Sequence, residues 1–83
     1  MNFRAAIDVM TKKEILDPQG KAVKLGLNNI GIDAIKDVRI GRHIVVEIEA
    51  DNETEAQQKI EIACKKLLAN LIMEDYHYTI SKI

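Results

Sequence analysis

Residues 3–10 read FRAAIDVM, and the apolar members of one alternate set are Phe3, Ala5, Ile7 and Val9. Arg4 and Asp8 belong to the other set. Because successive side chains of a strand point to opposite faces, this alternation predicts a strand with one face toward a core. Such a strand needs further elements to cover its apolar face, and the rest of the chain supplies them.

A helix is predicted to begin at Pro18, within the segment ILDPQG at residues 15–20. Asp17 can accept hydrogen bonds from the free N–H groups of the first turn, and a proline at the first helical position loses no hydrogen bond. The predicted apolar stripe is Val23, Leu27 and Ile30, with Ala22 and Gly26 on the same side. Gly31 suits a left-handed helix end. The pattern predicts an amphipathic helix of about three turns.

Two strands are predicted within residues 34–50. The first contains Ile35, Val38 and Ile40, and the second alternates Ile44, Val46 and Ile48 with polar residues. Gly41 indicates a reversal or a bulge between them. A bulge near Asp37 would reconcile the uneven apolar spacing of the first strand with a regular alternation.

A second helix is predicted to begin at the capping box TEAQ, residues 54–57. Its predicted buried stripe is Ala56, Ile60, Ala63 and Leu67, flanked by Cys64 and Leu68. Asn70 is predicted to end the helix in the left-handed conformation. A last strand is predicted over residues 74–80, where two tyrosines and an isoleucine alternate with polar residues.

This order of elements predicts an α+β fold of the βαββαβ, ferredoxin-like type. Its antiparallel sheet carries both helices packed on one face. We expect one domain over residues 1–83. The other face of the sheet keeps Ala6 and Val45 among charged neighbours, and an open sheet also has unpaired edges. We therefore expect the chain to self-associate, to a dimer or a higher oligomer.

Composition narrows the classes of function. The chain is 47% hydrophobic and 30% charged, which is the range of globular proteins. Its formal net charge of -1 gives no field that would attract a nucleic acid. No apolar run is long enough to cross a membrane, no signal segment is recognisable, and Cys64 has no cysteine partner. We expect a cytoplasmic protein that binds neither nucleic acid nor membrane.

No arrangement of nucleophile, base and orienting residue matches a catalytic pattern, and Ser81 is the only serine. His43 and His77 have no neighbouring ligand motif and are interpreted as surface residues. Cys64 beside the helix stripe is interpreted as a packed hydrophobe. We therefore expect no catalytic residue, metal or cofactor on this chain.

Two polar segments remain as candidate contacts. Residues 17–20 could bind an anion at a helix start, although a cap made by Asp17 itself is favoured. Arg39 and Arg42 flank Gly41 and could grip a phosphate or an acidic partner loop. A solvated hairpin is an equally good interpretation of that second segment.

Several segments together resemble the PurS family in order, spacing and total length. They are ILDPQGKAV at residues 15–23, VRIGR at residues 38–42, CKKLLAN at residues 64–70 and IMEDY at residues 72–76. The resemblance covers essentially the whole chain. Two positions depart from it, because Leu71 stands where the family usually has proline and Arg42 where lysine is commoner. Losing the proline makes the exit from the second helix less rigid.

The resemblance implies a non-catalytic small subunit of phosphoribosylformylglycinamidine (FGAM) synthase, in purine biosynthesis. In that ATP-dependent complex a large synthetase subunit would hold ATP and magnesium, and a glutaminase subunit would release ammonia from glutamine. The small subunit would join the two. The candidate contact residues are Asp17, Pro18, Gln19, Gly20, Arg39, Gly41, Arg42, Asn70 and Glu74.

An alternative is a regulatory module of the ACT type that senses a small molecule. Such modules share the order of elements and bind amino acids at a Pro/Gly turn before the first helix. Gln19 separates Pro18 from Gly20 here, which counts against this alternative.

Overall fold

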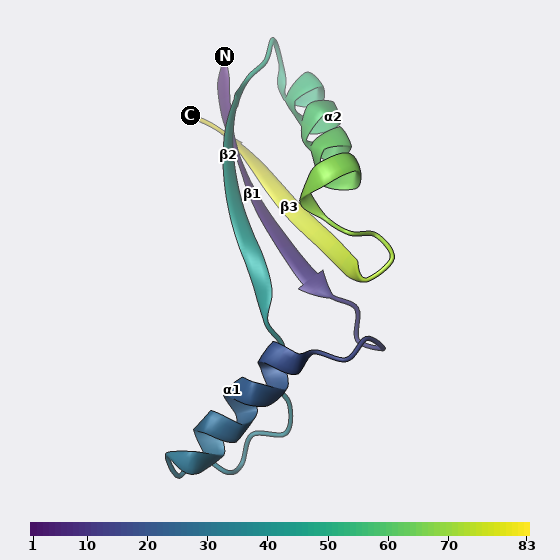
Figure 1. Cartoon of the computed structure of the whole chain (residues 1–83). Coiled ribbons are helices and arrows are strands. Elements are labelled where there is room, and N and C mark those ends of the chain that lie inside the picture. The colour runs from purple at the N-terminus through teal and green to yellow at the C-terminus, as the bar shows by residue number, and fades with distance from the viewer.

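A computed structural model describes all of residues 1–83 and contains a three-stranded antiparallel sheet with two α-helices (Figure 1). The elements in chain order are β1 (Asn2–Thr11), α1 (Pro18–Asn29), β2 (Gly41–Glu49), α2 (Glu53–Ala63), a π-helical turn (Cys64–Leu68) and β3 (Glu74–Lys82). The strand order in the sheet is β2-β1-β3. The α+β class with an antiparallel sheet is confirmed. Neither helix has the length and apolar content that crossing a bilayer requires.

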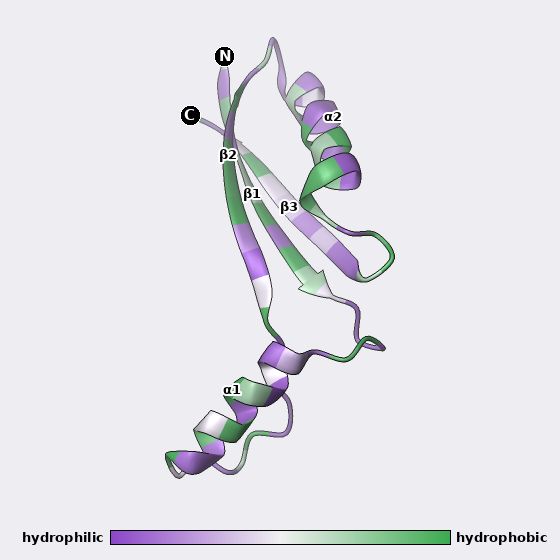
Figure 2. Cartoon of the chain, viewed as in Figure 1, coloured by the Kyte–Doolittle hydropathy of each residue, from purple (hydrophilic) through white to green (hydrophobic).

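The first strand is the centre of the sheet, and α2 covers one of its faces. Ala5 lies opposite Val46 of β2 and Ile80 of β3, so these three side chains share a face. The core consists of Phe3, Ala5, Ile7, Val9, Ala50, Ala56, Ile60, Cys64 and Ala69, all of them buried. Figure 2 shows the corresponding apolar colouring along the strands and the inner side of α2. The predicted alternation of β1 is thus confirmed.

The predicted strand over residues 34–40 is wrong, because this segment has no regular structure and runs back beside α1 (Figure 1). Lys24 of α1 donates to the carbonyl of Lys36 over 2.9 Å. Both edges of β1 are taken by β2 and β3, and the N–H of Ile40 donates to Asp17 instead of to a strand. A tight turn between two middle strands is therefore absent. The fold has three strands and not four.

The prediction that both helices pack on one sheet face is wrong for α1. This helix lies beyond the end of the sheet, and only Gly20 of its residues is buried (Figure 1). Val23 is 42% exposed and Ile30 is 71% exposed. The helix end is as predicted, since Gly31 has a φ of 91°. The physical reason for the placement is the anchoring of its first turn, described below.

The second helix begins and ends differently from the prediction. Asn52 is the N-cap, and its side chain accepts from the N–H of Glu55 over 2.8 Å, so the helix begins before the predicted box. The π-helical turn at Cys64–Leu68 then has more residues per turn than the α-helix before it. As a result Cys64 is fully buried, whereas Leu67 is 81% exposed and does not belong to the core.

The exit from the second helix also differs from the prediction. No residue other than glycine has a positive φ, so Asn70 is not a left-handed cap. Instead its side-chain oxygen accepts from the N–H of Ile72 over 3.1 Å, and its carbonyl accepts from the N–H groups of Met73 and Glu74. Asn70 therefore shapes a turn that leads into β3.

Candidate subunit-contact site

Asp17 anchors the root of α1 with both carboxylate oxygens. Oδ1 accepts from the N–H of Gly20 over 2.9 Å, which is the predicted cap. Oδ2 accepts from the N–H of Ile40 over 2.8 Å, a bond that links residues far apart in the sequence. Both bonds keep the pKa of Asp17 below its usual value, and the bond from Ile40 has the larger effect. One carboxylate thus fixes the first turn of α1 to the segment that enters β2.

Glycine is required at two positions in this region because the backbone passes close to another segment. A Cβ at Gly20 would collide with the carbonyl of Val38. A Cβ at Gly41 would collide with the side chain of Met10 and the carbonyl of Val9. Gly41 is therefore the first residue of β2, where the backbone lies close to β1. It does not mark the predicted reversal between two strands.

Arg42 and Glu74 form a bidentate ion pair between the starts of β2 and β3. The distances are 2.7 Å from Nη1 to Oε2 and 2.9 Å from Nη2 to Oε1. Nη2 of Arg42 also donates to the carbonyl of Leu68, and the N–H of Asn70 donates to Glu74, each over 2.9 Å. The guanidinium lowers the pKa of Glu74. The guanidinium of Arg42 is thus paired within the chain, and Arg42 is not the solvated charge of a hairpin.

Most of the predicted contact residues line one surface pocket of about 340 Å³, here called the root pocket. Its lining consists of Thr11, Leu16, Asp17, Pro18, Gln19, Ile40, Gly41, Arg42, Met73 and Glu74. Six of the nine predicted residues are among them. Gly20 lies buried behind the cap, and Asn70 reaches the pocket through its bond to Glu74. The structure therefore brings separate sequence segments to one end of the sheet.

Arg39 lies apart from the root pocket, in an adjoining pocket of about 350 Å³ that Lys13 and Lys21 also line. Its Nη2 is buried without a hydrogen-bond partner. Arg39 also lies near enough to Asp17 to favour the charged carboxylate. The two arginines flanking Gly41 thus have different surroundings.

The apolar side chains of the root pocket are not among the residues predicted from the sequence. Leu16 is 64% exposed and Met73 is 46% exposed, although both are large and apolar. Each lies within a segment of the PurS resemblance, but nothing local in the sequence shows that the two side chains converge. Exposed apolar groups beside satisfied polar groups are typical of a protein contact rather than of a catalytic site.

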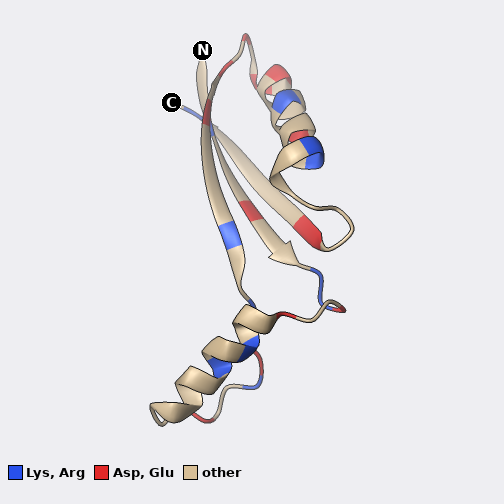
Figure 3. Ribbon diagram, in the orientation of Figure 1, with Lys and Arg blue, Asp and Glu red and all other residues tan.

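The outer face of the sheet, opposite α2, carries polar pairs across the strands. Arg4 donates to Glu47 over 2.8 Å, and His43 lies 2.7 Å from Asp8. Val45 stands between these pairs and is 55% exposed. Figure 3 shows acidic and basic positions interspersed along the strands. This face is mostly polar, with a small apolar centre.

A chain with a half-covered sheet, an unpacked helix and a pocket of exposed apolar and polar groups at their junction belongs to the class of small α+β modules that complete their packing on other chains. The family model described as "PurS: Phosphoribosylformylglycinamidine (FGAM) synthase" matches residues 4–82. The chain therefore belongs to the PurS family of FGAM synthase subunits. The alternative of an ACT-type sensor is not favoured by this match.

Relatives in sequence and in structure agree with the family. The phosphoribosylformylglycinamidine synthase subunit PurS of Synechocystis is 37% identical over 82 residues, covering 99% of this chain and 82% of the relative. Bacillus subtilis PurS superposes with a TM-score of 0.86 and 34% identity, covering 96% of this chain and 99% of the other. A chain of the PurLQS structure from Thermotoga maritima gives a TM-score of 0.89 and 31% identity, covering 98% and 99%.

Proposed function

We propose that this chain is the non-catalytic small subunit of FGAM synthase and joins the large synthetase subunit to the glutaminase subunit. The observation that carries the proposal is the similarity over nearly the full length to a chain of the Thermotoga maritima PurLQS structure. The family match over residues 4–82 supports the same role. The reaction is the glutamine-dependent conversion of formylglycinamide ribonucleotide to its amidine in purine biosynthesis, in the cytoplasm.

In this proposal the chemistry takes place on the other subunits. ATP and magnesium bind to the large subunit, and ammonia forms on the glutaminase subunit. The polar groups of the root pocket fit a structural role, because Asp17 caps α1 and Arg42 pairs with Glu74. The isolated chain is expected to have neither glutaminase nor ATPase activity.

The root pocket is the proposed contact with a larger subunit. Its apolar groups, Leu16 and Met73, surround residues whose charges are already satisfied, so an apolar side chain of a partner could enter without leaving a buried charge unpaired. Gln19 is exposed in the lining, and its side chain makes no hydrogen bond within the chain. A substitution there tests the contact without disturbing the core.

Co-purification with the two other subunits of the same source tests the proposed role. Glutamine-dependent FGAM formation is expected only when this chain is present. Gln19→Lys is expected to weaken assembly about tenfold or more, since a buried unpaired charge is costly. Gln58→Lys makes the same change at an exposed position of α2 and is the matched control. Full activity without the chain would overturn the proposal. Equal assembly by both variants would show that the root pocket is not the contact with a larger subunit.

A further inference from the structure

One arginine of the chain has no partner. The sequence contains three arginines, and two of them, Arg4 and Arg42, form ion pairs with glutamates on other strands. The side chain of the third, Arg39, forms no ion pair or hydrogen bond within the chain, and its Nη2 is shielded from solvent. A shielded charge without an acceptor is unfavourable. The unpartnered guanidinium therefore indicates that an acceptor comes from outside the chain.

Arg39 lines the pocket of about 350 Å³ that adjoins the root pocket, here called the arginine pocket. Three segments form it: the loop between β1 and α1, the first turn of α1 and the segment that enters β2. Each segment contributes one basic side chain, and these are Lys13, Lys21 and Arg39. Figure 3 shows basic positions on all three segments, where α1 meets the sheet. Positive groups that are separate in the sequence thus surround one cavity.

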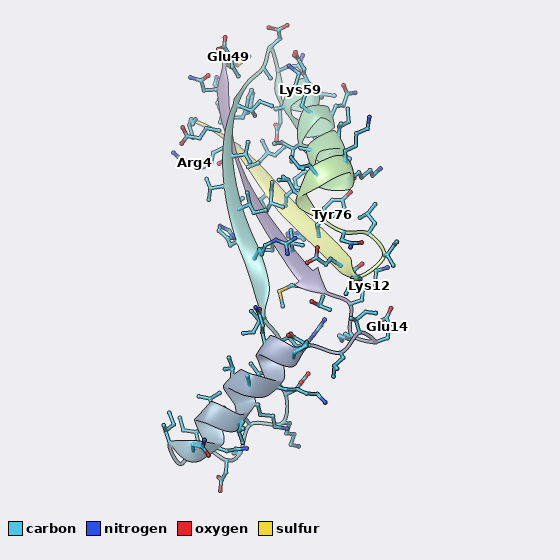
Figure 4. All side chains as sticks on the ribbon, viewed as in Figure 1. Arg4, Lys12, Glu14, Glu49, Lys59 and Tyr76 are labelled. Carbon is cyan, nitrogen blue, oxygen red and sulfur yellow. The ribbon has the colours of Figure 1, made fainter.

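Three carboxylates also line the arginine pocket, but none of them forms an ion pair with its basic side chains. Both oxygens of Asp17 accept from backbone N–H groups. Oδ1 of Asp37 accepts from the next backbone N–H over 3.0 Å. Glu14 is exposed on the loop between β1 and α1, and its side chain makes no hydrogen bond within the chain (Figure 4). The three basic side chains therefore keep their donors free for a ligand.

The backbone on both sides of Arg39 is held in place. On one side the N–H of Ile40 donates to Asp17 over 2.8 Å. On the other side the carbonyl of Val38 lies close to Gly20 of α1. The planar guanidinium therefore projects from a fixed backbone, whereas the two lysines are exposed and have flexible stems. A fixed fork beside two mobile ammonium groups is suited to binding an oxyanion.

The number of donors selects the kind of oxyanion. A guanidinium binds two oxygens of a carboxylate or of a phosphate side by side. A carboxylate then has no further oxygen for the two ammonium groups. A phosphate monoester has a third oxygen and a charge of about −1.5 to −2 at pH 7. Three basic side chains around one cavity therefore favour a phosphate group.

The size and the walls of the cavity indicate that the phosphate is part of a larger molecule. Pockets that bind small molecules have volumes of about 300–1,000 Å³, and apolar side chains form much of their walls. Ile15, Leu16 and Val38 line the arginine pocket beside the basic groups, and Leu16 is 64% exposed. These side chains can cover the less polar part of a molecule that carries the phosphate.

We propose that the arginine pocket binds the phosphate group of a small organic phosphate, with Arg39 on two of the phosphate oxygens and Lys13 and Lys21 on the third. Arg42 takes no part, because Glu74 already binds its guanidinium. The three basic side chains of this site lie outside the root pocket. The proposal is therefore independent of the proposed role in FGAM synthase.

Amide chemical shifts of the full chain, labelled with a nitrogen isotope, test the site. Sodium phosphate is compared with sodium chloride at equal ionic strength. Saturable shifts are expected with phosphate at millimolar concentration, at residues 13–21 and 37–40 and not on α2. AMP is expected to bind more tightly than inorganic phosphate, because its base and sugar can contact the apolar wall. Adenosine, which lacks only the phosphate, is expected not to bind.

Substitutions at Arg39 separate the charge from the planar geometry. Arg39→Gln is expected to raise the dissociation constant for phosphate at least about tenfold. Arg39→Lys keeps the charge but loses the fork, so an intermediate loss is expected. Lys66→Gln removes one positive charge at an exposed position outside the pocket and is the matched control. Equal weakening by Arg39→Gln and Lys66→Gln would overturn the proposal, and so would the absence of saturable shifts with phosphate and AMP.

Thermal unfolding at one protein concentration gives an independent measurement. Arg39→Met removes the unpartnered charge, so the melting temperature of the free chain is expected to stay unchanged or to rise. Phosphate is expected to raise the melting temperature of the unmodified chain by mass action, and that of Arg39→Met no more than sodium chloride does. A clear loss of stability in free Arg39→Met would show that the guanidinium has a structural partner within the chain and would overturn the proposal.

Discussion

Glu61 of α2 accepts a hydrogen bond of 2.5 Å from the hydroxyl of Tyr76 on β3. The hydroxyl of Tyr78 donates to the other oxygen of the same carboxylate over 2.6 Å. The two rings are stacked, with centroids 6.3 Å apart. One carboxylate thus attaches α2 to β3 at the border of the core, and it has chemical consequences for all three groups.

Both tyrosines are expected to resist ionisation in the folded chain. The bond to Glu61 raises the pKa of Tyr76 from 10.0 to about 12, and it raises the pKa of Tyr78 as well. Because the folded pKa of Tyr76 lies above the unfolded one, its contribution to stability is complete below pH 10 and is lost as the pH rises toward 12. Tyrosinate absorbance measures this directly, since the chain has two tyrosines and no tryptophan.

Glu61→Gln is expected to move the tyrosinate transition back toward its usual pH. The amide has no negative charge and accepts on one oxygen only. Glu55→Gln, in the same helix and remote from the rings, is the control. An unchanged transition in Glu61→Gln would mean that the carboxylate does not hold the hydroxyl protons.

Arg42→Ala is expected to destabilise the chain by about 1 kcal/mol, because it removes both guanidinium donors of Glu74 and the side-chain donor to the carbonyl of Leu68. Glu74 is only 15% exposed, so water replaces the guanidinium poorly. Urea unfolding at fixed protein concentration measures the change. Arg4→Ala, which breaks the exposed pair with Glu47, is expected to cost less. Equal effects would show that the bidentate geometry contributes nothing.

Gly20→Ala is expected to destabilise the root of α1 by about 2 kcal/mol, since the new Cβ collides with the carbonyl of Val38. Helix propensity alone predicts the opposite sign, because alanine is the better helix former. Gln19→Ala, one residue earlier and exposed, is the matched control. Thermal unfolding followed by circular dichroism distinguishes the two, and a stabilised Gly20→Ala would contradict the close approach.

Cys64 is expected to react with thiol reagents only when the chain opens. It is fully buried between α2 and the sheet, and burial raises the pKa of its thiol. Labelling should therefore be slow in buffer and fast in denaturant. Cys64→Ser places a hydroxyl in the core and is expected to cost about 1–3 kcal/mol, more than Cys64→Ala. Rapid labelling of the folded chain would show that the core near Cys64 is open.

Features that depend on neighbouring residues could be predicted from the sequence. The alternation of residues 3–10 and 74–80 predicted β1 and β3, because a strand with one buried face repeats every two residues. Asp17 and Pro18 predicted the start of α1, because a cap and its N–H groups lie within one turn. The candidate contact residues came from separate polar segments and from the family resemblance, and the structure brings six of the nine to the root pocket.

Features that depend on distant residues were decided only by the tertiary structure. Residues 34–40 have apolar positions typical of a strand, but Lys24 donates to the carbonyl of Lys36 and Ile40 donates to Asp17, so the segment is held beside α1. The stripe of α1 predicted a core helix, yet the anchor formed by Asp17 and Gly20 holds that helix off the sheet. The π-helical turn exchanged Leu67 for Cys64 in the core. In the first two cases a hydrogen bond or a close approach between distant segments outweighed the local pattern, since an apolar stripe specifies that a surface is covered but not by which element or chain.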